Sequence, residues 1–135
     1  MSVLINIDTP DLAAAEAFYT AAFGLTVGRR FGGEVVELTG WPAPLYLLLK
    51  AAGTVGAGGR PRTYERHWTP VHLDVVVDDI DAALERALAA GAVLEQAVAT
   101  HSWGRIALMA DPFGHGFCLL QFLGRGYDEI ADPPP

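Results

Sequence analysis

The sequence predicts an α+β fold made of two β-α-β-β-β modules. Two stretches of similar pattern, 68 residues apart, each contain a short apolar strand, an aspartate and a helix that ends near a glycine. In the first stretch, apolar residues alternate from Val3 to Ile7 as in a half-buried strand, and then recur at helical spacing up to Gly24. The second stretch repeats this order from His72 to Gly91. A duplicated strand-helix unit therefore organises the chain.

Each module is expected to continue with three strands after its helix, separated by glycine- and proline-containing turns. The expected elements are helices over 12–23 and 80–90 and strands over 3–8, 25–31, 35–38, 45–50, 72–77, 93–100, 105–110 and 117–123. Each helix should cover the outer face of its sheet. The two mixed sheets are then expected to curve into a cup whose inner, partly polar faces enclose a groove.

The length of 135 residues and the mass of 14.4 kDa fit a single domain spanning 1–135. Module 1 is expected to cover about 1–53 and module 2 about 70–124. Between them, the glycine-rich segment 54–69 should form a mobile loop. The C-terminal extension, 125–135, is expected to cap the cup or to support a dimer.

Composition narrows the class of protein. Cys118 is the single cysteine, so no intrachain disulfide forms, and the N-terminus has neither an export signal nor a membrane-spanning stretch. We therefore expect a cytoplasmic protein with no membrane partner. The net charge is −7, with 3 basic and 10 acidic residues from Trp68 onward. This balance argues against nucleic-acid binding and favours a neutral or cationic ligand, although a solvated acidic surface is the simpler explanation.

Three motifs carry a family resemblance. Asp11-Leu12 leads to Phe18-Tyr19 and Phe23-Gly24-Leu25 in the first module, 72–79 opens the second, and Asp111-Pro112-Phe113-Gly114 precedes the last strand. Together they resemble the glyoxalase, bleomycin-resistance and extradiol-dioxygenase group, which is the vicinal oxygen chelate superfamily. The resemblance implies modules paired within one chain or by exchange between chains. It also implies that enzymes of the group hold a divalent metal on the first and last strands of the modules.

Four positions correspond to the metal ligands that the resemblance implies. Leu4 and His72 form the first-strand pair, and an alignment of the two last strands makes Leu47 and Cys118 the other pair. Leucine offers no donor atom, and only His72 is a ligand of the usual family type. A catalytic zinc generally needs three protein ligands. The sequence therefore predicts no metal and no other cofactor.

The predicted ligand contacts combine polar side chains, one stacking aromatic and an apolar floor: Asn6, His72, Asp74, Trp103, Leu47, Cys118 and Phe122. His72 and Asp74 share one face of an alternating strand and are also the candidate base and orienting carboxylate, should the protein be an enzyme. His115 is expected to be only a turn residue, and His67 only a loop residue.

The preferred hypothesis is a metal-independent small-molecule binding protein of the bleomycin-resistance type, and not an enzyme. We expect it to form a homodimer. It would sequester an antibiotic-like or other aromatic or cationic ligand. The alternative is a lyase, isomerase or dioxygenase of the same fold. Such an enzyme would use a non-standard metal site at His72 and Cys118, or metal-free acid-base chemistry by His72 and Asp74. A third possibility is an interaction module whose groove is closed by a dimer partner.

Overall fold

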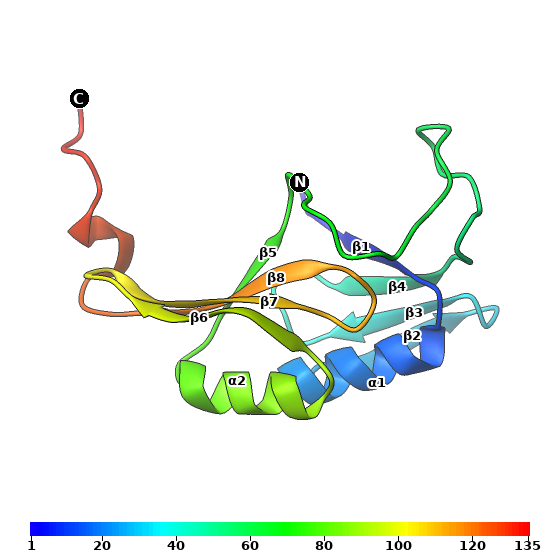
Figure 1. Ribbon diagram of the computed structural model, residues 1–135, viewed down its shortest axis with the longest axis horizontal. Helices are drawn as coiled ribbons and strands as arrows, with labels where there is room; N and C mark the ends of the chain where they lie inside the picture. Colours follow the sequence, from blue (N-terminus) through cyan, green and yellow to red (C-terminus); the bar gives the residue numbers. More distant parts are fainter.

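A computed structural model describes residues 1–135 and confirms the two β-α-β-β-β modules (Figure 1). Module 1 contains β1 (Ile5–Thr9), α1 (Leu12–Phe23), β2 (Thr26–Phe31), β3 (Val35–Thr39) and β4 (Leu45–Leu49). Module 2 contains β5 (Leu73–Val76), α2 (Ile80–Ala89), β6 (Val93–Thr100), β7 (Gly104–Ala110) and β8 (Gly116–Phe122). Every predicted helix and strand is present, with ends shifted by at most two residues.

Each module forms its own four-stranded mixed sheet, with strand orders β1-β4-β3-β2 and β5-β8-β7-β6. The first strand of each module pairs in parallel with the last, and the other pairs are antiparallel. In this register Asn6 lies opposite Tyr46, and Asp74 lies opposite Cys118. Because the two pairs occupy the same place in the repeat, Tyr46 is the counterpart of Cys118.

The predicted place of Leu47 in the groove is corrected by this register. Leu47 is fully buried and belongs to the hydrophobic core with Val36 and Phe18, on the side of the sheet covered by α1. Successive residues of a strand point to opposite faces, so a shift of one residue exchanges the core for the open face. Tyr46 faces the open side instead, and its hydroxyl donates a hydrogen bond to Glu37.

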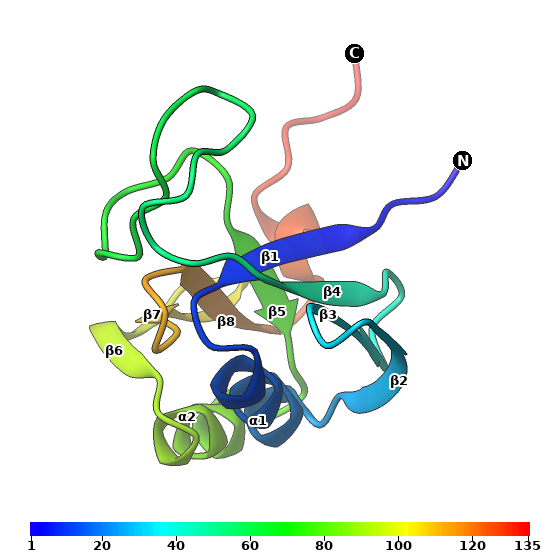
Figure 2. The same cartoon turned by 90° about the vertical axis from the view of Figure 1, so that its right-hand side faces the viewer.

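The two helices lie side by side on the same side of the two sheets (Figures 1 and 2). Each begins at an aspartate, Asp11 or Asp79, whose carboxylate accepts a hydrogen bond from the backbone N–H three residues later. Small and aromatic residues on their inner faces, including Ala15, Phe18 and Ala83, belong to one continuous core. The two modules therefore share a core within one chain.

The long connection between the modules is tied to both of them. Arg62 Nε donates to Asp8 at 2.8 Å, and the Tyr64 hydroxyl donates to the Lys50 carbonyl oxygen at 2.6 Å. On the other side, Gly114 approaches the loop so closely that a Cβ there would lie 2.2 Å from the Tyr64 carbonyl oxygen. These contacts tie the loop, drawn in green above the sheets in Figure 1, to both modules.

The C-terminal extension packs against one end of module 2. It forms a short 3₁₀ helix, η1 (Gly126–Glu129). The Tyr127 ring contacts Phe122 at 4.8 Å and Trp103 at 5.3 Å between ring centroids, and Trp103 in turn stacks on His101. The extension thus packs against Trp103 and Phe122, two aromatic side chains that were predicted to contact a ligand.

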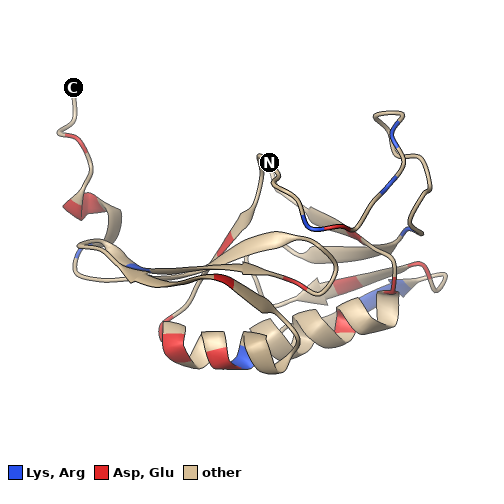
Figure 3. Ribbon diagram, in the orientation of Figure 1, with Lys and Arg blue, Asp and Glu red and all other residues tan.

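Charged side chains are spread over the surface (Figure 3). The acidic excess of the second module lies largely on exposed positions of α2 and the extension, such as Asp81, Glu85 and Asp128. Some of these acids form exposed ion pairs, as Asp81 does with Arg105 at 2.8 Å. This distribution agrees with a solvated acidic surface. Neither helix is long and apolar enough to cross a membrane.

Candidate functional site

A cavity of about 290 Å³ lies between the two modules. Residues of β1, α1, β5 and β8 line it, together with the end of the long loop and the turn before β8. Its aromatic lining consists of Tyr19, Phe23, Trp41, Tyr64, Phe113 and Phe117. Three imidazole rings, those of His67, His72 and His115, also face it, whereas no Asp, Glu, Lys or Arg side chain lines it. The cavity is therefore aromatic and carries no fixed charge.

The predicted site residues fall into three groups. Asn6 and His72 line the cavity, and Asp74 and Cys118 join His72 in a cluster beside it, whereas Leu47, Trp103 and Phe122 lie elsewhere. Trp103 is in the turn between β6 and β7, where its ring packs against Tyr127 of the C-terminal extension. Phe122 lies at the end of β8 and contacts the same extension.

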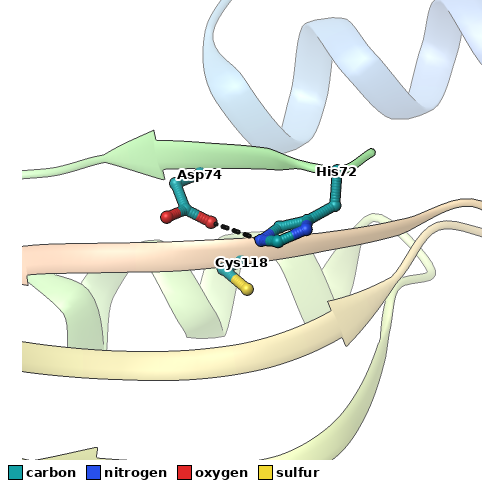
Figure 4. Close-up of side chains that lie close together, drawn as sticks. All are labelled: His72, Asp74 and Cys118. Carbon is teal, nitrogen blue, oxygen red and sulfur yellow. Dashed lines mark ion pairs between the residues drawn. The ribbon is translucent and has the colours of Figure 1, made fainter. Parts of the chain in front are cut away.

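The cluster of His72, Asp74 and Cys118 forms on the open face of the second sheet (Figure 4). His72 and Asp74 extend from the start of β5 on the same side, with 3.2 Å between His72 Nε2 and Asp74 Oδ1. Cys118 reaches the cluster from β8, because the parallel pairing sets it opposite Asp74. One ligand atom of each residue lies within 4.8 Å of the other two.

The Cys118 thiol is held in its neutral form. Burial raises the pKa of Cys118 to about 11, and the adjacent charge and hydrogen bond of Asp74 act in the same direction. Because only the thiolate is a nucleophile, Cys118 is not an activated catalytic cysteine in this environment.

We expect Cys118 to react with iodoacetamide at neutral pH at least ~100-fold more slowly than a free cysteine, since each unit of pKa changes the thiolate fraction about tenfold. Asp74→Asn removes the neighbouring negative charge and should accelerate alkylation several-fold. Asp78→Asn, an exposed position just beyond β5, is the matched control and should leave the rate unchanged. Alkylation of the wild-type protein at the free-cysteine rate would contradict this assignment.

The donor set of the cluster fits a zinc ion. Imidazole nitrogen, carboxylate oxygen and thiolate sulfur are all zinc ligands, and three protein ligands leave a fourth position open. Zinc–ligand distances of ~2.0–2.3 Å in a tetrahedral site set two ligand atoms ~3.3–3.8 Å apart, so the side chains would close by up to ~1.5 Å on binding the ion. Bound zinc at these residues would supply a Lewis acid.

The module 1 counterparts differ from this set. Leu4 has no donor atom, and the Tyr46 hydroxyl is hydrogen-bonded to Glu37 and Arg29. The polar side chains at the module 1 position, Tyr46, Glu37 and Arg29, thus already form hydrogen bonds with one another.

A second polar group reaches the cavity from the turn before β8. Asp111 is 3% exposed, and its carboxylate accepts hydrogen bonds from the Tyr19 hydroxyl at 2.7 Å and the backbone N–H groups of Phe113 at 2.8 Å and His115 at 2.9 Å. His115 Nδ1 also lies 2.7 Å from Asp111 Oδ2. An ionised carboxylate can only accept, so Nδ1 carries a proton and donates it in this bond.

The buried position of this group shifts two pKa values. Burial alone would raise the pKa of Asp111, but the hydrogen bond and charge of His115, with the Tyr19 hydroxyl, bring it below its ordinary value. Burial, reinforced by the charge of Asp111, raises the pKa of Tyr19 well above its ordinary value. Tyr19 is therefore a hydrogen-bond donor at neutral pH, and Asp111 is an anion.

Sequence reasoning missed several cavity residues. Tyr19 and Phe23 were predicted only as part of an apolar helix face, and His67 and His115 only as loop and turn residues. Two signals were available. A tyrosine in an otherwise apolar helix stripe needs a partner for its hydroxyl, and Asp111 precedes His115 by four residues in a tight Pro-Gly turn.

Known proteins with similar sequences and structures identify the family. Residues 4–120 match the glyoxalase-like domain family. The uncharacterized protein Rv0887c of Mycobacterium tuberculosis is 34% identical over 126 residues, a match that covers 82% of this chain and 68% of that protein.

Two solved structures show the same fold. One is a glyoxalase/bleomycin resistance protein/dioxygenase family enzyme from Burkholderia phytofirmans, with a TM-score of 0.70, 23% identity, and coverage of 89% of this chain and 97% of that one. The other is TioX from Micromonospora sp. ML1, with a TM-score of 0.70, 21% identity, and coverage of 91% and 99%. The chain belongs to the glyoxalase-like domain family of the vicinal oxygen chelate superfamily.

Proposed function

We propose that this protein binds a small aromatic molecule in the cavity between its two modules, without transforming it. The supporting observation is the cavity itself, about 290 Å³ with an aromatic lining. Ligand pockets are typically ~300–1,000 Å³, and an apolar cavity of ~150 Å³ holds benzene. A substituted monocyclic or a bicyclic ligand fits this volume better than a large antibiotic does.

The charge of the lining further restricts the class of ligand that the cavity can bind. Both aromatic and cationic ligands agree with the composition of the sequence. No carboxylate side chain lines the cavity, so a cation there would have no counter-charge, and His67, His72 and His115 would repel it when protonated. A flat, neutral or weakly acidic aromatic molecule is the ligand class that these side chains suit.

Thermal unfolding in the presence of probe compounds tests the proposal. At 100 times its Kd, 4-nitroanisole or 4-nitrophenol should stabilise the protein by ~2.7 kcal/mol, and benzyltrimethylammonium should bind more weakly. Val75→Phe, which fills the cavity, should abolish the shift. Val76→Phe is the matched control, because its side chain is 58% exposed and points to the other face of β5. No shift with any aromatic probe would contradict the proposal.

A second candidate function rests on the convergence of His72, Asp74 and Cys118. In this case the protein is an enzyme of the same superfamily that uses a metal held by module 2. Cobalt titration is a direct test, because a Co²⁺–thiolate bond gives a charge-transfer absorption. This band, lost in both His72→Ala and Cys118→Ser and kept in His101→Ala, would favour the enzyme. Its absence at millimolar cobalt would leave the binding protein as the better candidate.

The homodimer predicted from the sequence remains a proposal. Exposed apolar side chains, including Leu4, Val76 and Trp68, support it, since an isolated monomer gains nothing from exposing them. Light scattering after size exclusion should give twice the chain mass of 14.4 kDa. A monomer at all concentrations would exclude both the dimer and the interaction module that it would close.

A further inference from the structure

His115 lines the cavity between the modules and has one ring nitrogen with no hydrogen-bond partner in the protein. Its Nδ1 is bonded to Asp111 at 2.7 Å, so Nε2 is at the opposite edge of the ring, and no group of the protein is hydrogen-bonded to it. The ring is fixed on a second side by an edge contact with Tyr64, 6.2 Å between centroids. With Nδ1 protonated, Nε2 of the neutral ring has a lone pair that can accept a proton.

The partner of His115 distinguishes it from the other two histidines of the cavity. His67 Nδ1 lies 2.9 Å from the neutral carbonyl oxygen of Glu65. His72 meets the carboxylate of Asp74, but their side chains are 53% and 35% exposed. The Asp111 side chain is 0% exposed and accepts three other hydrogen bonds, so its charge is shielded from water and fixed in position. A positive charge formed on His115 faces this buried anion.

We propose that His115 selects aromatic ligands that carry an acidic hydroxyl and binds them as phenolates. The inference rests on the proposed function of the cavity. In the binding step the ligand O–H bond breaks, its electron pair stays on oxygen, and the proton forms an N–H bond with Nε2. The products are an imidazolium held by Asp111 and a phenolate that accepts a charge-assisted hydrogen bond from it.

The groups around His115 are compatible with an anion in the cavity. The titratable or charged side chains near it come from α1, the long loop, the strand β5 and its own turn, and they are Tyr19, Tyr64, Arg66, His67, His72 and Asp111. Arg66 reaches so close to Gly116 that a Cβ there would lie 2.5 Å from its guanidinium. Asp111 is the anion bonded directly to His115, and its oxygens are occupied by four donors. The charge of Arg66 is paired with Glu95 at 2.8 Å.

The ionisation state of bound 4-nitrophenol tests this inference, because its anion absorbs visible light and the neutral form does not. With wild-type protein in excess, the dye should ionise at a pH at least one unit lower than in free solution, a ~10-fold change in its acid constant. In His115→Gln the bound dye should lose this shift, and its affinity at neutral pH should fall ~10-fold or more. The ether 4-nitroanisole has no proton to transfer and should bind both proteins equally.

Each outcome has a separate meaning. If both probes bind and nitrophenol keeps the ionisation midpoint of the free dye, the role of His115 is excluded while the cavity remains a binding site. If neither probe binds to the wild-type protein, the proposed function itself fails. Equal binding of nitroanisole to both proteins shows that the variant is folded. If His115→Gln does not fold, the shift in the wild-type midpoint still decides the question, because it needs no variant.

Discussion

Replacing Asp111 by alanine should lower the free energy of unfolding by ~3–5 kcal/mol. The substitution leaves the Tyr19 hydroxyl, two backbone N–H groups and His115 Nδ1 without their acceptor in a site that is almost closed to water. Urea denaturation measures the change. Asp111 joins α1 of one module to the last turn of the other, so the loss should also weaken the junction that forms the cavity.

One control variant and a pH series separate the causes of this effect. Asp128→Ala, at an exposed position of η1, should change stability by no more than ~0.5 kcal/mol. Because the pKa of Asp111 is lower in the folded protein than in the unfolded chain, the unfolded state binds more protons as pH falls through the ordinary pKa of 3.8. The stability that the carboxylate contributes is therefore complete above this pH and declines below it. The difference between wild-type and Asp111→Asn proteins should shrink in that acidic range, and an unchanged difference would contradict the assignment.

Leu47→Ala should lower the free energy of unfolding by ~2–5 kcal/mol, the usual range for removing a fully buried leucine from a core. Leu47 is 0% exposed and packs between the first sheet and α1. The same substitution of a leucine on the floor of an open groove would lower the free energy of unfolding much less. The same urea measurement therefore tests the corrected register of β4.

The neighbouring leucine is the matched control. Leu48 is only partly buried and points to the other face of the same strand, so Leu48→Ala should be clearly less destabilising than Leu47→Ala. The reverse order of the two effects would show that the sheet faces are assigned the wrong way round.

The elements of the fold could be predicted because they follow from local patterns. The alternation in 3–7, the helical spacing in 12–23 and the glycines that end the segments each depend on neighbouring residues only. The position of Leu47 could not be predicted in this way. The two last strands differ in length, so their sequences alone do not fix which residues correspond. A shift of one residue in a strand is the difference between the core and the open face.

The candidate site was predictable where it lies within one sheet and not where it joins the modules. His72 and Asp74 are two residues apart on one strand, so their meeting follows from strand geometry. The contact of Tyr19 with Asp111 spans 92 residues and depends on how α1 packs against module 2. Trp103 was predicted to stack on a ligand, but only the path of the extension shows that its ring packs against Tyr127 instead.

The most direct test of ligand binding between the modules is a methyl NMR titration of the protein with 4-nitroanisole. We expect saturable shifts that are largest for the methyl groups of Ile5, Ile7 and Val75, which line the cavity. The methyl groups of Leu48 and Val76, on the open faces of the two sheets, should be nearly unaffected. Shifts centred on Leu48 and Val76, or no saturable shift at all, would contradict the cavity as the binding site.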